Sequence, residues 1–129
     1  MDEGIRRALS RGQVIDITTM GRRTGQSRRI EIVSHVFGGH TYISGLPAKR
    51  TRAWIRNLEA DPNFTVHLKG PGSIADLPAT ARVITDEPER RRILDQVARV
   101  WRRTDVAEMV RYSPLIEVTI AGYTDATAA

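Results

Sequence analysis

The feature that most constrains this fold is a series of short β-type segments joined by tight turns. Val14 to Thr19 is rich in β-branched residues, and Arg28 to Phe37 alternates apolar and polar residues with the period of two that is typical of a half-buried strand. Gly38-Gly39 predicts a hairpin turn into a returning strand, His40 to Ser44. Strands joined at hairpin spacing pair with each other in opposite directions, so we expect a mostly antiparallel sheet.

The rest of the chain alternates further strands with short helices. Strands are predicted at 63–69, at 73–85 with an interruption near Pro78, and at 115–120. Helices are predicted at 2–11, at 51–60 with Thr51 as its cap, at 86–103 and at 105–112. This order predicts a small closed or nearly closed barrel with helices over its openings.

The longest predicted helix, 86–103, has clear signals at its start and along one face. Asp86 and Glu89 have the spacing of a capping box. The apolar face is predicted to consist of Ile93, Val97, Val100 and Trp101. Beyond the last strand, Gly122 to Ala129 is a tail of mostly small residues that we expect to fray.

Length and composition narrow the class of protein. With 129 residues, we expect a single domain over 1–129. The chain has no cysteine, and His35, His40 and His67 show no metal-ligand spacing, so no metal site is expected and these histidines should have structural or surface roles. No apolar run approaches the ~20 residues of a membrane span. The charged N-terminus lacks the apolar stretch of a signal peptide, and we expect a cytoplasmic protein.

Positive charge is concentrated in one part of the chain. Residues 1–70 carry twelve basic and six acidic side chains, whereas residues 71–129 carry eight and nine. Arginine grips phosphate and carboxylate by paired hydrogen bonds, so an anionic ligand is expected. From composition alone that ligand is a nucleic acid, a nucleotide-like cofactor or an acidic partner, and a solvated basic face is equally compatible. The cationic residues within 20–56 are Arg22, Arg23, Arg28, Arg29, Lys49, Arg50, Arg52 and Arg56.

Two segments combine these cations with small residues. Thr18 to Arg29 places arginines on both sides of a turn that contains Gly21 and Gly25, and its main-chain amides are predicted to form a phosphate cradle. Tyr42 to Leu58 ends a strand at Ser44-Gly45, which lets a planar ring approach the backbone, before a basic loop and a short helix. The sequence contains no nucleophile elbow, phosphate-binding loop or dinucleotide fingerprint, so an enzyme of this kind needs a cofactor to carry its chemistry.

Both segments resemble the deazaflavin (F420)-dependent nitroreductase family, whose members bind coenzyme F420 on a split β-barrel related to FMN-binding proteins. The resemblance covers about residues 13–121. It includes the Thr-Thr-x-Gly-Arg-Arg-Thr-Gly-x-x-Arg pattern at Thr18 to Arg28 and the Trp-x-x-Asn-Leu-x-Ala-x-Pro pattern at Trp54 to Pro62. It implies a mainly β, α+β fold with a six-stranded barrel and peripheral helices. It also implies an F420H2-dependent reductase that passes hydride between the deazaflavin and a small activated alkene, quinone or nitro compound.

The resemblance also implies a set of coenzyme-binding residues. Arg23 and Arg28, with Arg22 and Thr24 nearby, carry over as the phosphate site, and Lys49 and Arg50 carry over to phosphate or to the glutamate tail. The residues expected along the deazaflavin or over it are Ile30, Glu31, Ile32, Ser44, Gly45, Trp54 and Asn57. Tyr112 is the candidate on the substrate side, and no catalytic side chain is otherwise identified. Split barrels of this kind often pair through a sheet face, which implies a homodimer.

Departures from the family pattern leave alternatives open. Glu31-Ile32 stands where many members have Pro-Leu, and Gly45-Leu46-Pro47 replaces a Lys-Gly-Gly stretch. An FMN-binding barrel would leave Lys49 and Arg50 without a clear role, because FMN has a single phosphate and no glutamate tail. The sequence does not distinguish an enzyme from a carrier that binds F420 without turnover. A basic nucleic-acid-binding barrel is disfavoured, because the few aromatic residues do not interleave with the arginines.

Overall fold

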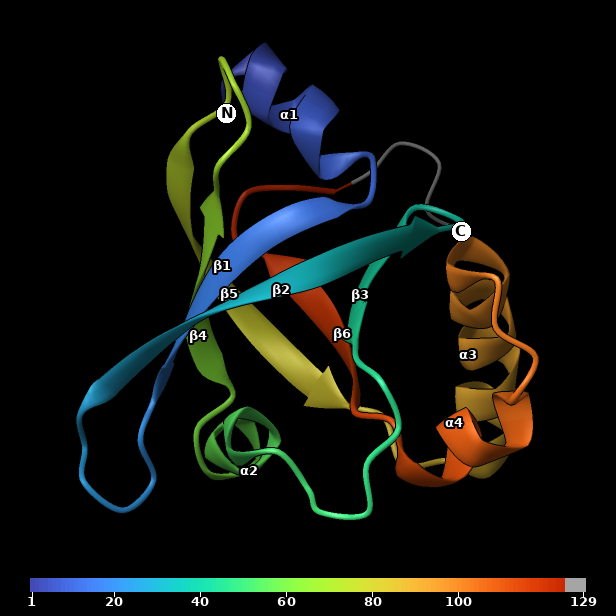
Figure 1. The fold of residues 1–129 in the computed structure, drawn as a ribbon. Helices are drawn as coiled ribbons and strands as arrows, with labels where there is room; N and C mark the ends of the chain where they lie inside the picture. The colour runs from blue at the N-terminus through green and yellow to red at the C-terminus, as the bar shows by residue number, and fades with distance from the viewer. Residues whose placement is uncertain (125–129) are drawn as a thin grey trace.

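The computed structural model describes residues 1–124 and shows a closed six-stranded barrel with four helices outside it (Figure 1). Around the barrel the strands follow the order β1-β2-β3-β6-β5-β4, and β4 pairs with β1 to close it. Every pairing is antiparallel, as the hairpin spacing predicts. The strands are β1 (Gln13–Met20), β2 (Ser27–Phe37), β3 (His40–Ser44), β4 (Asn63–Leu68), β5 (Ala75–Val83) and β6 (Leu115–Ile120).

The predicted order of elements and the barrel are confirmed. The helices are α1 (Glu3–Leu9), α2 (Ala53–Ala60), α3 (Glu87–Trp101) and α4 (Val106–Tyr112). Gly38 and Gly39 form the predicted β2–β3 turn with φ values of 58° and 79°, a conformation that residues with a side chain rarely adopt. The structure of 125–129, which belong to the predicted frayed tail, lies outside the described residues.

The barrel and the helical layer have separate apolar cores. Inside the barrel, alternate residues of each strand meet around Ile17 and Ile43, both fully buried. Outside it, α3 and α4 pack over Tyr42 and Leu115 and form a second core (Figure 1). This second layer also buries His35, whose ring lies 5.2 Å from that of Trp101, and burial lowers the pKa of this imidazole. His35 therefore has a structural role.

Three local predictions are wrong. Thr51 does not cap α2, because the helix begins one residue later and Arg52 takes the cap position without a side-chain hydrogen bond. Pro78 does not interrupt β5, since the register with β6 begins at Ala79 and needs no Pro78 amide. Val100 is 58% exposed and does not belong to the buried face of α3, which consists of Ile93, Leu94, Val97 and Ala98.

The start of α3 follows only half of the predicted capping box. The Asp86 side chain accepts a hydrogen bond from the Glu89 amide at 3.0 Å. The Glu89 carboxylate does not return this bond and instead binds Arg82 of β5 through both oxygens, at 2.9 and 2.7 Å. Glu89 therefore ties α3 to the barrel. None of the helices within residues 1–124 has the length and apolar character needed to cross a membrane.

Candidate functional site

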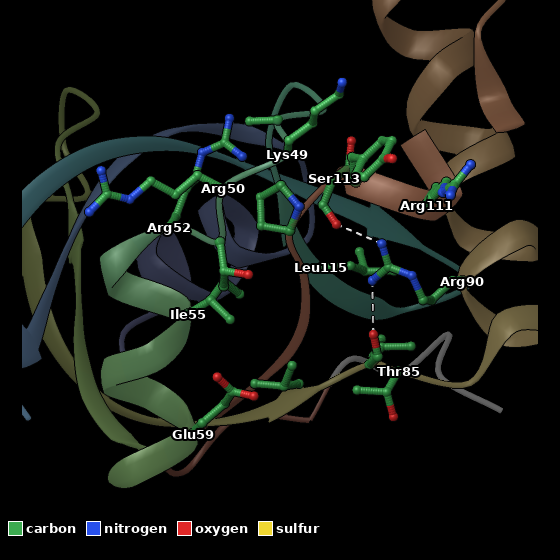
Figure 2. Close-up of a pocket in the computed structure, with 16 residues that line it drawn as sticks. Lys49, Arg50, Arg52, Ile55, Glu59, Thr85, Arg90, Arg111, Ser113 and Leu115 are labelled. Atoms are coloured by element: carbon green, nitrogen blue, oxygen red, sulfur yellow. Dashed lines mark hydrogen bonds between the residues drawn. The ribbon is translucent and has the colours of Figure 1, made fainter. Parts of the chain in front are cut away.

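Two adjoining hollows lie where α2 and the loop before it meet the barrel end. The first, the arginine surface, encloses about 580 Å³ and is lined by Arg22, Arg23, Arg50, Thr51, Arg52, Ala53 and Arg56. The second, the central cavity, encloses about 310 Å³ between the 48–52 loop, α2, the end of β5 and residues 111–115 (Figure 2). Both are lined by Arg50, Thr51 and Arg52, so the two hollows are continuous along this stretch of loop.

The turn between β1 and β2 requires glycine at two positions and uses most of its own amides in internal hydrogen bonds. Gly25 has φ 71°, and a Cβ on Gly21 would lie 2.8 Å from the Gln26 carbonyl oxygen, so both positions require glycine. The amides of Gly21 and Gly25 are bonded inside the turn, and those of Arg22 and Gln26 donate to the side chains of Asn57 and Thr24. Most of the turn's amides are thus already used, so an anion bound here would be held mainly by arginine side chains. The amide cradle stays a prediction.

Asn57 of α2 fixes this turn to the body of the protein. Its buried side-chain oxygen accepts hydrogen bonds from the Arg22 amide at 3.2 Å and from Arg22 Nη1 at 3.1 Å. Its amide nitrogen donates to Thr19 Oγ1 at 3.1 Å. One side chain therefore joins β1, the turn and α2, and it orients Arg22 along the arginine surface.

The loop before α2 completes the arginine surface. Arg52 Nη2 donates to the Leu46 carbonyl at 2.7 Å and closes the loop on itself, and partial burial lowers the pKa of this guanidinium. A Cβ on Gly45 would lie 3.1 Å from Pro114 and 3.3 Å from Arg52 Cζ, so a larger residue would push these groups apart. Arg56 lies one helical turn after Arg52 and shares its face of α2.

The opposite wall of the central cavity is held by hydrogen bonds to main-chain groups. The Ala48 amide donates to the Tyr112 carbonyl at 3.3 Å, and Ser44 Oγ donates to the Pro114 carbonyl at 2.7 Å. Arg90 of α3 reaches the same wall and donates to four carbonyls, those of Ile84, Met109, Val110 and Ser113, at 2.9, 3.4, 2.9 and 2.6 Å. Figure 2 shows the bonds to Ile84 and Ser113. Burial lowers the pKa of the Arg90 guanidinium.

The electrostatics of the two hollows are strongly cationic. Within residues 1–124, no carboxylate lies within 4.0 Å of the charged groups of Arg22, Arg23, Arg28, Lys49, Arg50, Arg52 or Arg56. Glu31 does not neutralise them, because it points to the outer barrel face and pairs with Lys69 at 2.5 Å. Lys69 and Arg29 in turn hold Asp16 at 2.7 and 2.8 Å, and their hydrogen bonds lower the pKa of that carboxyl group.

The structure brings together some of the predicted residues and separates others. Arg22, Arg23 and Arg50 line the arginine surface, and Lys49, Arg50 and Tyr112 line the central cavity. Arg28 is paired in register with Thr19, so its side chain leaves the hairpin on the side of α2. Thr24 lies in the turn itself. The remaining predicted residues line neither hollow: Ile30 and Ile32 face the barrel core, Trp54 and Asn57 are buried, Ser44 and Gly45 lie behind the Pro114 wall, and Glu31 is on the outer face.

Several lining residues are absent from the sequence prediction. Arg52 and Arg56 have a helical spacing of four within the basic segment, and that spacing is a usable signal. Arg90, Arg111 and Glu59 carry no such signal, because each belongs to a polar helix surface whose partner elements are distant in sequence. Only the packing of α3 and α4 against the barrel places Arg90 and Arg111 at the cavity.

Comparisons with known proteins agree with this geometry. A family model described as F420H2-dependent quinone reductase matches residues 2–122. A comparison with curated protein sequences found no match. Among solved structures, the chain is similar to an F420 reductase, with 16% identity and a TM-score of 0.63 over 95% of this chain and 97% of the other.

Two further solved structures share the fold. An F420-H2 dependent reductase is 21% identical, with a TM-score of 0.56 over 82% of this chain and 93% of the other. A conserved hypothetical protein from Mycobacterium tuberculosis is 18% identical, with a TM-score of 0.65 over 94% of this chain and 81% of the other. At these identities the structural matches support the split-barrel fold.

Proposed function

The chain belongs to the F420H2-dependent quinone reductase family and is therefore an F420H2-dependent reductase, and we propose that its substrate is a small quinone or a comparably activated alkene or nitro compound. The observation that carries this proposal is the continuity of the two hollows. One is lined almost entirely by arginines, and the other adds an apolar floor that includes Ile55, Val83 and Leu115. An elongated coenzyme with an anionic tail and a planar reactive ring needs both.

The cationic side chains at and beside the arginine surface fit coenzyme F420. This coenzyme joins a planar deazaflavin to a phosphodiester and a tail of glutamates, so it is multiply anionic. Arg22, Arg23 and Arg50 would hold the phosphate, with Arg28 approaching from the hairpin, and Arg52 and Arg56 would meet the tail. Because these cations have no carboxylate partner among residues 1–124, binding an anion replaces no existing ion pair.

The central cavity is suited to hold the reacting groups. Ile55, Pro114 and Leu115 provide apolar contact for a planar ring, and Tyr112 presents a hydroxyl group to a bound substrate. When bound in its reduced form, the coenzyme supplies a hydride that, with one proton, converts a quinone to its hydroquinone. The protein contributes position and electrostatics, because the cavity holds both reactants together and its cations favour negative charge on the reduced substrate.

Coenzyme choice is the direct test of this assignment. F420 should bind at least about ten-fold tighter than FMN, a difference of about 1.4 kcal/mol, because FMN lacks the glutamates that would reach Arg52 and Arg56. A fluorescence titration with both compounds measures this. Equal affinity, or a protein that purifies with bound FMN, would support an FMN enzyme instead. Steady-state oxidation of F420H2 by a quinone separates an enzyme from a carrier, since a carrier gives binding without turnover.

The same observations bear on partners. None of the described residues that line the arginine surface is aromatic, so it offers no stacking platform for nucleic-acid bases, and we propose that nucleic acid is not its ligand. We also propose a cytoplasmic homodimer, as the family resemblance implies. Light scattering during size-exclusion chromatography measures the oligomeric state.

A further inference from the structure

The central cavity has a second cationic end that the coenzyme assignment does not use. Figure 2 shows Lys49, Arg50 and Arg52 on one side of the cavity, next to the arginine surface, and Arg90 and Arg111 on the other. The floor between them is apolar and includes Ile55, Val83 and Leu115. Glu59 is the only acid among the described residues that line the cavity. The two ends are therefore separate sites for negative charge.

Arg111 is available to a ligand. Its guanidinium lies over the ring of Tyr112, with Cζ 5.2 Å from the ring centroid, a geometry that orients the group without neutralising it. Within residues 1–124 it has no carboxylate partner within 4.0 Å, whereas its neighbour in space Arg91 pairs with Glu87 at 3.3 Å. The Arg111 side chain is exposed, so a ligand reaches it from the cavity mouth.

Arg90 adds fixed positive charge deeper in the wall. A guanidinium has five N–H donors, and the four bonds to carbonyls leave one N–H on Nη1 unused. These four bonds also lock its orientation before any ligand arrives. Carbonyl groups solvate the charge of Arg90 but do not cancel it, so an anion at this end of the cavity meets a preorganised cation.

We infer that the substrate carries a carboxylate or similar acidic group, bound by Arg111 and Arg90, while its reducible part lies over the apolar floor. This inference rests on the proposed function, because it places the coenzyme at the opposite end. The chemical class is an acidic quinone or acidic conjugated compound. A neutral substrate of the same shape would leave both guanidinium groups without an anionic partner.

The test compares an acidic quinone with its neutral isostere. A naphthoquinone with a short carboxymethyl group and the corresponding primary amide are each reduced with F420H2, and the ratio of their kcat/KM values is measured. The wild-type protein should favour the acid by about ten-fold, the usual effect of one charge-assisted hydrogen bond. Arg111→Gln should lower this ratio several-fold, with Arg90 keeping a remaining preference for the acid, and Arg111→Lys should restore part of the loss because the charge returns.

Matched controls separate the possible failures. Arg99→Gln removes an exposed arginine of α3 that pairs with Asp95 at 2.8 Å, and it should keep the wild-type ratio. A wild-type ratio near one would overturn the acidic-substrate inference while leaving the reductase intact. A loss of F420 affinity of about ten-fold or more in Arg111→Gln would also overturn it, since this would assign Arg111 to the coenzyme tail. Absence of turnover with both quinones would contradict the proposed function itself.

Discussion

The arginines of residues 20–56 and those around α3 have the same side chain in opposite surroundings. Around α3, each of Arg82, Arg91, Arg92, Arg99 and Arg103 has a carboxylate within 4.0 Å. In the first segment, Arg29 pairs with Asp16, but within residues 1–124 the cations at the two hollows have no such partner. Arg82 connects β5 to α3 and β6, whereas the other four pair within α3 or with a residue two positions away. The cations of residues 20–56 that line the two hollows lie close together instead.

Crowded cations without acidic partners reduce the stability of the protein in the absence of an anionic ligand. Like charges repel, and this repulsion is only partly screened at physiological salt because the Debye length is about 8 Å. The fold accepts this cost and holds the cations in place with neutral groups, including the Asn57 side chain and the Leu46 carbonyl. A surface of this kind is preorganised for a polyanion, whereas Arg91, Arg92 and Arg99 of α3 already have carboxylate partners.

The largest expected effect comes from removing two cations of the arginine surface. Arg23→Ala with Arg50→Ala should raise the F420 dissociation constant more than about 100-fold, since each charge-assisted hydrogen bond contributes about 1.5–3 kcal/mol. A fluorescence titration measures it. The matched double variant, Arg91→Ala with Arg99→Ala, removes the same charge from α3 and should stay within about two-fold. Equal losses in both pairs would mean that net charge, and not location, determines binding.

Arg28→Ala removes a single cation that lies close to the arginine surface. Arg28 leaves the hairpin beside Thr19 on the side of α2, and its loss should weaken F420 binding by about 10-fold to 100-fold. Arg92→Ala, at an arginine of α3 that lies 4.0 Å from Glu89, should change affinity by no more than about two-fold. Thermal melting of both variants shows whether packing of the aliphatic stem contributes. Unchanged affinity in Arg28→Ala would exclude Arg28 from the coenzyme site.

Asn57→Ala tests whether neutral groups hold the cationic surface in place. This change leaves the buried Thr19 hydroxyl and the Arg22 amide without a partner, so the free energy of unfolding should fall by about 1–3 kcal/mol. Urea denaturation measures the fall. F420 affinity should also decrease, because the turn loses its anchor to α2. Full stability together with reduced affinity would instead indicate direct contact between Asn57 and the coenzyme.

Salt concentration should have a smaller effect on F420 binding than these substitutions. Raising ionic strength should weaken F420 binding several-fold, because exposed arginines contact a polyanion. Thermal stability in the absence of coenzyme should rise slightly or stay constant over the same range, since screening reduces repulsion within the arginine surface. A dissociation constant that does not change with salt would mean that these cations form only a solvated face.

The smallest expected effect concerns pH and the paired region. The hydrogen bond from Arg82 lowers the pKa of Glu89, whose ordinary value is 4.5. The pair therefore contributes its full stability above pH 4.5 and loses it as pH falls through the lowered folded-state pKa. The loss should be below about 1 kcal/mol, given the partial exposure of the pair. The urea midpoint should fall more between pH 6 and pH 3 in the wild type than in Arg82→Met. An equal fall in both proteins would contradict the assignment.

Most of the fold could be predicted because local signals agree with it. The period-two alternation of β2, the Gly38-Gly39 turn and the start of α3 at Asp86 each depend on residues close in sequence. The wrong predictions concern positions whose structure depends on an element distant in sequence. Pro78 is tolerated because of its register with β6, and Val100 is exposed because α3 packs through a face rotated from the predicted one.

The antiparallel barrel, its order of elements and the cationic character of residues 20–56 follow from periodicity, turn residues and charge, which are properties of neighbouring positions. Which of these cations lack a carboxylate partner depends on long-range packing. Glu31 lies among arginines in sequence but pairs with Lys69 on the outer face, and the turn amides bond inward to Asn57 and Thr24. Arg90 and Arg111 reach the cavity from α3 and α4 because those helices pack on the barrel, a contact between segments that no local pattern encodes.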